Sequence, residues 1–156
     1  MKTLESLFRK IGPKFVLLGV GNPLRADDGA GPELLRRLRN KTSAILLDCE
    51  EVPENYLGEI AAIQPETVVV IDAVNLGTRA GAVALLEEDN FQSIGWSTHH
   101  GSLRPMIKYI KANTKADVFV LGIQPKSTEF GTEISPEVRQ TIDLLQLLIT
   151  GNSASR

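Results

Sequence analysis

The chain has 156 residues, of which 17 are Lys or Arg and 19 are Asp or Glu, giving a formal net charge of −2. Hydrophobic residues make up 42% of it, which predicts a folded protein with one sizeable core and excludes a disordered chain. The near-balance of charge gives no general electrostatic reason to bind nucleic acid or an anionic membrane surface.

Cysteine content and the N-terminal residues indicate a cytoplasmic protein. The single cysteine, Cys49, cannot form an internal disulfide, which fits a reducing compartment. The opening residues MKTLESLFRKIGPK lack the apolar core of a secretory signal, and no apolar window is long enough to span a membrane. We therefore expect one domain over residues 1–156, with 1–13 as an N-terminal extension and 151–156 as a frayed tail.

Strand-like and helix-like patterns alternate along the chain. In chain order we predict a short helix within 3–11, a strand at 14–20, a helix at 31–40, a strand at 43–49, a helix at 53–63, strands at 67–73 and 81–88, a helix at 102–113, a strand at 117–123 and a helix at 135–149. Ser135 is the expected N-cap of the last helix, with Pro136 at its first position.

Four of the five predicted strands are almost continuously apolar, as expected for strands covered on both faces of a parallel sheet. The run at 81–88 follows a short loop and is the one for which an antiparallel direction is open. The alternation predicts an α/β fold of three layers, a twisted and mostly parallel five-stranded sheet with helices on both faces. Ligands of such sheets bind beyond the carboxyl ends of the strands, here at 21–28, 48–51 and 72–75.

The first of these segments, GVGNPLRADDGAG, raises the possibility of a phosphate-binding turn. The dinucleotide fingerprint needs a third glycine where this chain has Leu24, and Pro23 removes a backbone donor. Asp27 and Asp28 would repel a pyrophosphate, although Asp48 stands where a ribose-binding acid would. Taken alone, the segment favours a tight turn followed by a helix cap.

A second possibility is a metal site. Asp72 ends a strand of otherwise apolar residues, where a carboxylate is costly unless it is paired, hydrogen-bonded or bound to metal. The segment STHHGS at 97–102 contains both histidines of the chain and precedes a helix. Two carboxylates and one imidazole would leave open coordination positions, as in catalytic metal sites. The residues alone leave a metal site and structurally used polar groups equally open.

Four segments together resemble one enzyme family. GVGNPLRADDGAGPELLRRL, VVVIDAVN, STHHGSL and FVLGIQP are similar to motifs of the nickel–iron hydrogenase maturation endopeptidases, over about residues 14–150. LGIQP and PEN are similar to the branch that processes the large subunit of membrane-bound, hydrogen-evolving hydrogenases. The resemblance implies an α/β fold and one cleavage, which removes a C-terminal extension from the precursor after nickel has been installed.

The resemblance also implies a set of site residues. Asp28, Asp72 and His99 would be the metal ligands and catalytic residues, with His100 as a neighbour of the histidine ligand. Gly21 and Asn22 would contact the substrate protein, and Asp48 would position the substrate or support the site. Nickel would be supplied by the metal centre of the precursor, and Asp27 is expected to order the turn or the start of the following helix.

Two other functions are compatible with these residues. One is a nickel-sensing chaperone that binds the precursor without cutting it, and the other is a nucleotide-binding α/β domain. Serine and cysteine protease mechanisms are disfavoured, since no G-x-S-x-G elbow occurs and Cys49 has no evident histidine partner. The expected partner is thus a hydrogenase large-subunit precursor, with neither nucleic acid nor membrane insertion.

Overall fold

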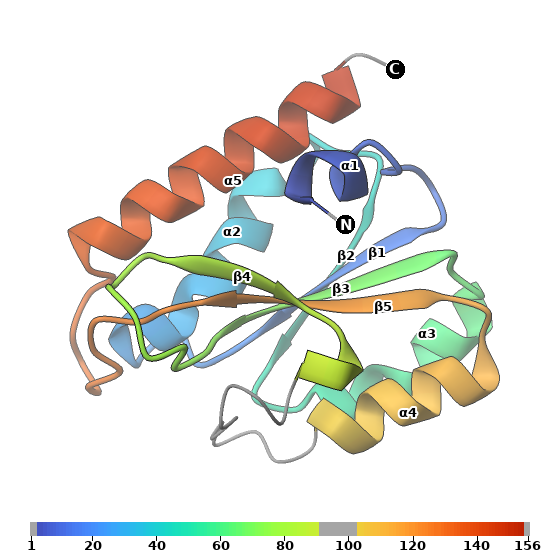
Figure 1. Ribbon diagram of the computed structural model, residues 1–156, viewed down its shortest axis with the longest axis horizontal. Coiled ribbons are helices and arrows are strands. Elements are labelled where there is room, and N and C mark those ends of the chain that lie inside the picture. Colours follow the sequence, from blue (N-terminus) through green and yellow to red (C-terminus); the bar gives the residue numbers. More distant parts are fainter. Residues whose placement is uncertain (1–2, 91–102, 155–156) are drawn as a thin grey trace.

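A five-stranded sheet forms the middle of the protein, in the order β2-β1-β3-β5-β4 (Figure 1). The computed structural model describes residues 3–90 and 103–154. β1, β2, β3 and β5 are parallel, and β4 runs antiparallel to β5 at one edge. The strands are β1 (Phe15–Val20), β2 (Ile45–Glu50), β3 (Thr67–Ala73), β4 (Val83–Leu86) and β5 (Asp117–Ile123).

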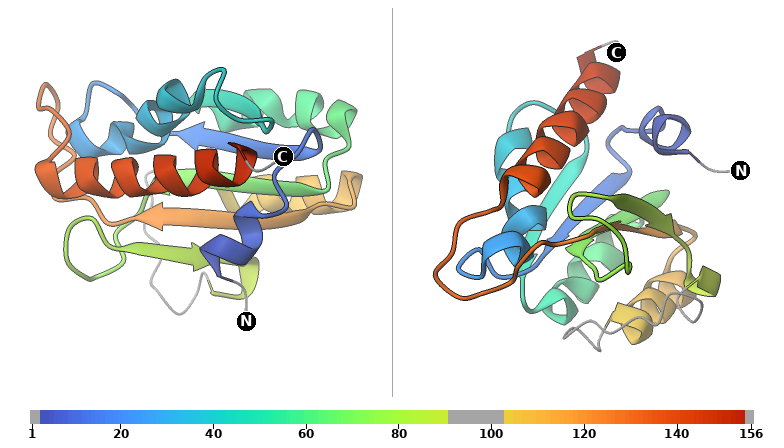
Figure 2. Two further views of the ribbon diagram at one scale, coloured as in Figure 1. Left: turned by 90° about the horizontal axis from the view of Figure 1, so that it is seen from above. Right: turned by 60° about the vertical axis from the view of Figure 1, so that its left-hand side comes forward.

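Helices cover both faces of this sheet, so the predicted three-layer α/β architecture is confirmed (Figures 1 and 2). α1, α2 and α5 lie on one face, and α3 and α4 lie on the other. The helices are α1 (Leu4–Phe8), α2 (Ala30–Leu38), α3 (Leu57–Ile63), α4 (Leu103–Asn113) and α5 (Pro136–Ala154), with 3₁₀ turns η1 (Ala26–Gly29), η2 (Pro53–Tyr56) and η3 (Glu88–Asn90).

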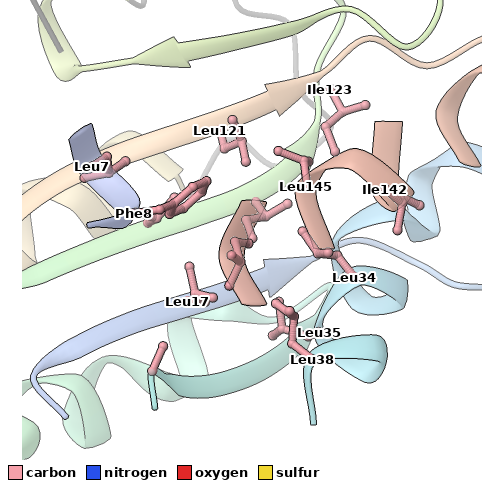
Figure 3. Packing of buried hydrophobic residues seen from close by; sticks show 14 of the residues in the cluster. Leu7, Phe8, Leu17, Leu34, Leu35, Leu38, Leu121, Ile123, Ile142 and Leu145 are labelled. Atoms are coloured by element: carbon pink, nitrogen blue, oxygen red, sulfur yellow. The ribbon is translucent and has the colours of Figure 1, made fainter. Parts of the chain in front are cut away.

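Alternate residues of the strands divide between two apolar cores, one on each face of the sheet. On β3, Val69 and Ile71 face α2 and α5, whereas Val68 and Val70 face α3 and α4. Figure 3 shows the first core, in which side chains from α1, α2 and α5 meet the strands. Burial of each such Leu or Ile side chain stabilises the fold by about 1.5–3 kcal/mol.

β2 differs from the prediction, which treated it as a strand buried on both faces. It lies at the edge of the sheet, where only Cys49 of its six residues is fully buried. The apolar run of β2 predicts a strand but does not predict its place in the sheet. An edge strand also packs one face against helices, so it too contains apolar residues. A register shift between Gly19 and Val20 opposite β2 marks a bulge near its carboxyl end.

Helices lie near both ends of the described chain. α1 begins at a capping box, in which Thr3 and Ser6 exchange side-chain and backbone hydrogen bonds. Leu7 and Phe8 of this helix are fully buried, so the N-terminal extension is part of the core. At the other end, α5 extends to Ala154, beyond residue 149, where the predicted helix ended.

A chain of charged side chains joins α2 to α5. Arg37 contacts both Glu33 on its own helix and Asp143 on α5. The hydrogen bond from Arg36 is the main reason that the pKa of Glu33 is lowered to about 2. α2 is therefore anchored at its outer face as well as in the core. Among the described helices, none is long and apolar enough to cross a membrane.

Candidate functional site

The carboxyl ends of β1 and β3 lie side by side in the middle of the sheet. From β1 the chain leads to β2 on one side, and from β2 it returns to β3 on the other side of β1. The order of strands therefore reverses between β1 and β3, which is where ligands bind in open α/β sheets. Asp28 follows β1 in the 3₁₀ turn η1, and Asp72 is the penultimate residue of β3.

Asp28 and Asp72 are both fully buried and lie close to each other. Burial is the main cause that raises the pKa of the Asp72 carboxyl well above its ordinary range. The negative charge of Asp28 raises it further, whereas a hydrogen bond with the backbone of Ala73 acts in the opposite direction. A buried carboxylate whose ionisation is opposed by a neighbouring negative charge forms a site that a cation would stabilise.

The turn after β1 holds Asp28 in this position. The backbone N–H of Asn22 donates to Asp28 Oδ2 at 2.9 Å, and Asn22 Oδ1 accepts from the N–H of Leu24 at 2.9 Å. Gly21 has a φ of 140°, and a Cβ there would stand 1.8 Å from the carbonyl oxygen of Asp28. Only glycine can occupy this position, which explains the G-N pair of the motif.

A second close approach fixes the start of α2 against the sheet. A Cβ on Gly31 would lie 2.4 Å from the carbonyl oxygen of Ile71 and 3.0 Å from the backbone nitrogen of Val20. Gly31 thus lets α2 touch β1 and β3 at once. Because Ile71 precedes Asp72 and η1 leads directly into α2, this contact determines the distance between the two acids.

Asp27 has a structural part that differs from that of its neighbour Asp28. Its buried carboxylate accepts hydrogen bonds from the backbone N–H groups of Lys126 at 2.8 Å and Ser127 at 3.4 Å. It also accepts from Ser135, both backbone and hydroxyl. Of the two roles expected for Asp27, which are to order the turn or the start of the following helix, its hydrogen bonds fit the first, since the helix that they reach is α5 and not α2. Figure 2 shows the segment before α5 beside the turn after β1.

The LGIQP motif has a structural explanation that the sequence did not supply. The side chain of Gln124, which follows β5, accepts from the N–H of Leu76 and donates to the carbonyl oxygen of Pro125. Its backbone pairs with Ala82 and Gly81. Gln124 therefore fixes the chain that leaves β3, just beyond Asp72.

Asp48 does not join the two acids. It lies on β2, exposed, and faces a depression of about 180 Å³ that Arg36 of α2 and Arg39, the residue after α2, also line. Asp48 shares this face of the sheet with Leu46, which packs on the α2 core, whereas Asp72 alternates with Ile71 and faces the other way. The predicted substrate residues Gly21 and Asn22, by contrast, both contact Asp28.

The predicted histidine ligand, His99, and its neighbour His100 lie outside the described residues. The first described residue after them is Leu103, at the start of α4. Within 3–90 and 103–154, no three side chains of His, Cys, Asp or Glu gather as a metal site. The described part of the candidate site thus consists of two carboxylates, Asp28 in η1 and Asp72 at the end of β3.

Comparison with known proteins assigns the chain to a class of enzyme. The sequence profile of a family described as hydrogenase maturation protease matches residues 30–151. The chain therefore belongs to the hydrogenase maturation proteases, which are hydrolases of peptide bonds. Membership of this family confirms the resemblance seen in the sequence and disfavours a nucleotide-binding domain.

Particular relatives cover nearly the whole chain. The crystal structure of the nickel–iron hydrogenase maturation protease HycI from Thermococcus kodakarensis is 32% identical, with a TM-score of 0.88 over 98% of this chain and 99% of that one. The solution structure of the endopeptidase HycI from Escherichia coli is 27% identical, with a TM-score of 0.76 over 87% and 89%. Hydrogenase 3 maturation protease of Escherichia coli is 27% identical over 87% of this chain and 88% of its own length.

Proposed function

We propose that this protein removes a C-terminal extension from the large-subunit precursor of a nickel–iron hydrogenase, and that it recognises the nickel already held by that precursor. The observation that carries the proposal is the buried pair of Asp28 and Asp72 at the point where the strand order reverses. Family membership supports the reaction class, and the pair supports a cationic group as part of the substrate.

The residues present fit such a group. A carboxylate away from water is expensive, and two that repel each other are more so, unless a positive charge lies between them. We assign Asp28 and Asp72 as two ligands of the substrate nickel and His99 as the third. Three ligands would leave coordination positions for groups of the precursor, as in metal sites that exchange ligands.

In this proposal the chain's own residues bind and orient the precursor. The N–H of Asn22 holds the Asp28 carboxylate in place through Oδ2. A divalent metal at the site would supply Lewis acidity toward a carbonyl or a water molecule. Hydrolysis itself breaks one C–N bond, adds the hydroxyl of water to the acyl carbon and returns a proton to the amine that leaves.

Recognition of the metal would also provide specificity. A precursor without nickel would lack the group that bridges it to Asp28 and Asp72, and it would leave the two acids to repel each other. The difference in affinity between the two precursors would then exclude premature cleavage. Asp48 belongs to this proposal only as a contact of the substrate protein on the α2 side of the sheet.

Intact-protein mass spectrometry of the precursor tests the proposal. The precursor, with and without nickel, is incubated with wild-type protein, with Asp28→Ala and with Asp117→Ala, which changes an exposed acid at the opposite end of a strand. With the nickel-loaded precursor, we expect wild-type protein and Asp117→Ala each to release one C-terminal peptide. We expect Asp28→Ala to release none.

Two outcomes would contradict it. Cleavage of the nickel-free precursor at the same rate would remove metal recognition from the mechanism. A stable complex of wild-type protein with the nickel precursor, and no cleavage, would favour the chaperone that binds the precursor without cutting it.

A further inference from the structure

A cleft of about 460 Å³ opens beside the turn that holds Asp28. One wall is Asn22, Pro23 and Leu24, and the other is the end of β2 and the residues after it, Glu50 to Val52. The carbonyl oxygen of Glu50 accepts from the N–H of Gly21 at 2.7 Å, so the two walls are joined at the floor. Asn22 lines the cleft and its N–H also donates to Asp28 Oδ2, so the cleft adjoins the residue that holds this buried acid.

Exposed apolar side chains stand at the mouth of this cleft. Leu24 is 62% exposed on one wall and Val52 is 41% exposed on the other. Single exposed hydrophobic residues are common, but one on each wall of the same cleft indicates a contact surface for a partner.

The cleft also carries negative charge. Glu50 and Glu51 are exposed on its β2 wall. Between Lys41 and Arg79 the chain has no Lys or Arg but seven acidic residues, so no cation of that stretch neutralises the wall. Arg25 belongs to the turn after β1, but its Nε donates to the carbonyl oxygen of Thr128, in the loop before α5. A cleft with this charge attracts a basic partner.

We propose that this cleft binds the part of the hydrogenase precursor that flanks the cleaved bond, with a basic side chain against Glu50 and Glu51 and an apolar one against Leu24 and Val52. This inference rests on the proposed function and adds to it a specificity for the residues that flank the cleaved bond. An extended segment seated here would pass Asn22 and reach the acids with its peptide bond. The protein would thus recognise the amino-acid sequence around the cleaved bond in addition to the metal and independently of it.

The test uses a synthetic peptide that spans the cleaved bond of the precursor, and it measures binding by calorimetry and cleavage of the whole precursor by mass spectrometry. In the double variant Glu50→Gln, Glu51→Gln we expect peptide affinity and kcat/KM to fall by about ten-fold, with kcat nearly kept. The affinity of the wild type should fall with added salt, and that of the double variant should not.

Matched controls separate the cleft from general effects of substitution. Glu66→Gln changes an exposed glutamate just before β3, at the amino edge of the sheet. Leu24→Ser is compared with Leu144→Ser, because both leucines are 62% exposed and Leu144 lies on α5. We expect both controls to behave as wild type and Leu24→Ser to bind the peptide less tightly.

A charge exchange gives the sharpest result. Glu51→Lys should bind the natural peptide poorly and should recover affinity for a peptide whose basic residue next to the bond is changed to glutamate. Unchanged affinity in the double glutamine variant, or no recovery in the exchange, would overturn the inference. Peptide binding by a wild-type protein that cuts no precursor would overturn the proposed endopeptidase and leave the cleft standing, because binding is scored apart from cleavage.

Discussion

The carboxylate of Asp27 accepts two hydrogen bonds from Ser135, one from its backbone N–H at 2.7 Å and one from its hydroxyl at 2.9 Å. The two residues are 108 positions apart in the chain. Ser135 Oγ in turn accepts from the N–H of Val138 at 3.3 Å, which confirms it as the N-cap of α5. One buried acid thus joins the turn of the candidate site to the start of the last helix.

Asp27→Ala should destabilise the protein strongly. The substitution removes the acceptor of Lys126, Ser127 and Ser135 and leaves their partly buried donors unsatisfied, at a cost of about 2–4 kcal/mol. Urea unfolding followed by circular dichroism measures this loss. Asp117→Ala, at an exposed position, should change the free energy of unfolding by less than about 0.5 kcal/mol. Equal effects of the two substitutions would show that the Asp27 hydrogen bonds contribute little.

Alanine substitutions of Gly31 and Gly58 should have opposite signs, although both glycines lie in helices. A Cβ on Gly31 would collide with the backbone of Ile71, so Gly31→Ala should destabilise by about 2 kcal/mol or more and reduce cleavage. Gly58 has no atom within 4 Å of such a Cβ, and Gly58→Ala should stabilise by about 0.5–1 kcal/mol. Thermal unfolding of both variants measures the difference, and a stabilising Gly31→Ala would contradict the close contact.

Asp72→Asn should raise stability while it abolishes cleavage. The amide removes a buried charge and its repulsion with Asp28, which should stabilise the metal-free protein by about 1 kcal/mol. Because the pKa of Asp72 is raised in the folded state, the wild-type carboxyl becomes neutral as the pH falls. The advantage of the asparagine should therefore be largest at mildly alkaline pH and should shrink toward acidic pH.

Unfolding midpoints of wild type and Asp72→Asn across that pH range check this sign. Asp117→Asn serves as the control, because its position is exposed. A variant less stable than wild type at every pH would mean that the Asp72 carboxylate is stabilised by its surroundings in the absence of metal.

Cys49 should be inert in the folded protein. Its side chain is fully buried and donates to the carbonyl oxygen of Leu47, and burial, aided by the charges of Asp48, Glu59 and Glu54, raises the pKa of the thiol to about 12. Since the thiolate is the reactive form, iodoacetamide at neutral pH should modify Cys49 only after denaturant is added. Rapid modification of native protein, or loss of cleavage in Cys49→Ala beyond its loss of stability, would point to a part in the reaction.

Much of the fold could be predicted because its signals are local. Apolar runs of strand length identified β1, β3 and β5, and the alternation with helices gave the layers. The rule for carboxyl ends of parallel strands predicts from the sequence alone that Asp28 and Asp72 lie at one edge of the sheet. The antiparallel direction of β4, left open in the sequence, is settled by its pairing with β5.

The parts that could not be predicted depend on contacts between distant residues. No local pattern marks Asp27 as the partner of Ser135, or separates it from the neighbouring Asp28, because both are acids in the same turn. The edge position of β2 depends on which strand pairs with β1, which composition does not encode. The function of Gln124 as a clamp on Leu76 likewise needs the third dimension. The assignment of His99 as the third ligand stays a prediction.

Asp27 and Asp28 of η1 have different contacts, and this restricts which changes the turn can accept in evolution or engineering. Asp27 reaches the segment before α5 and Asp28 reaches Asn22, so adjacent positions serve opposite sides of one short turn. One inserted or deleted residue between Gly21 and Gly29 would rotate each acid into the other's surroundings. The fold should therefore tolerate substitutions at the exposed residues from Pro23 to Arg25 far better than a change in the length of the turn, and tags or fused peptides belong elsewhere in the chain.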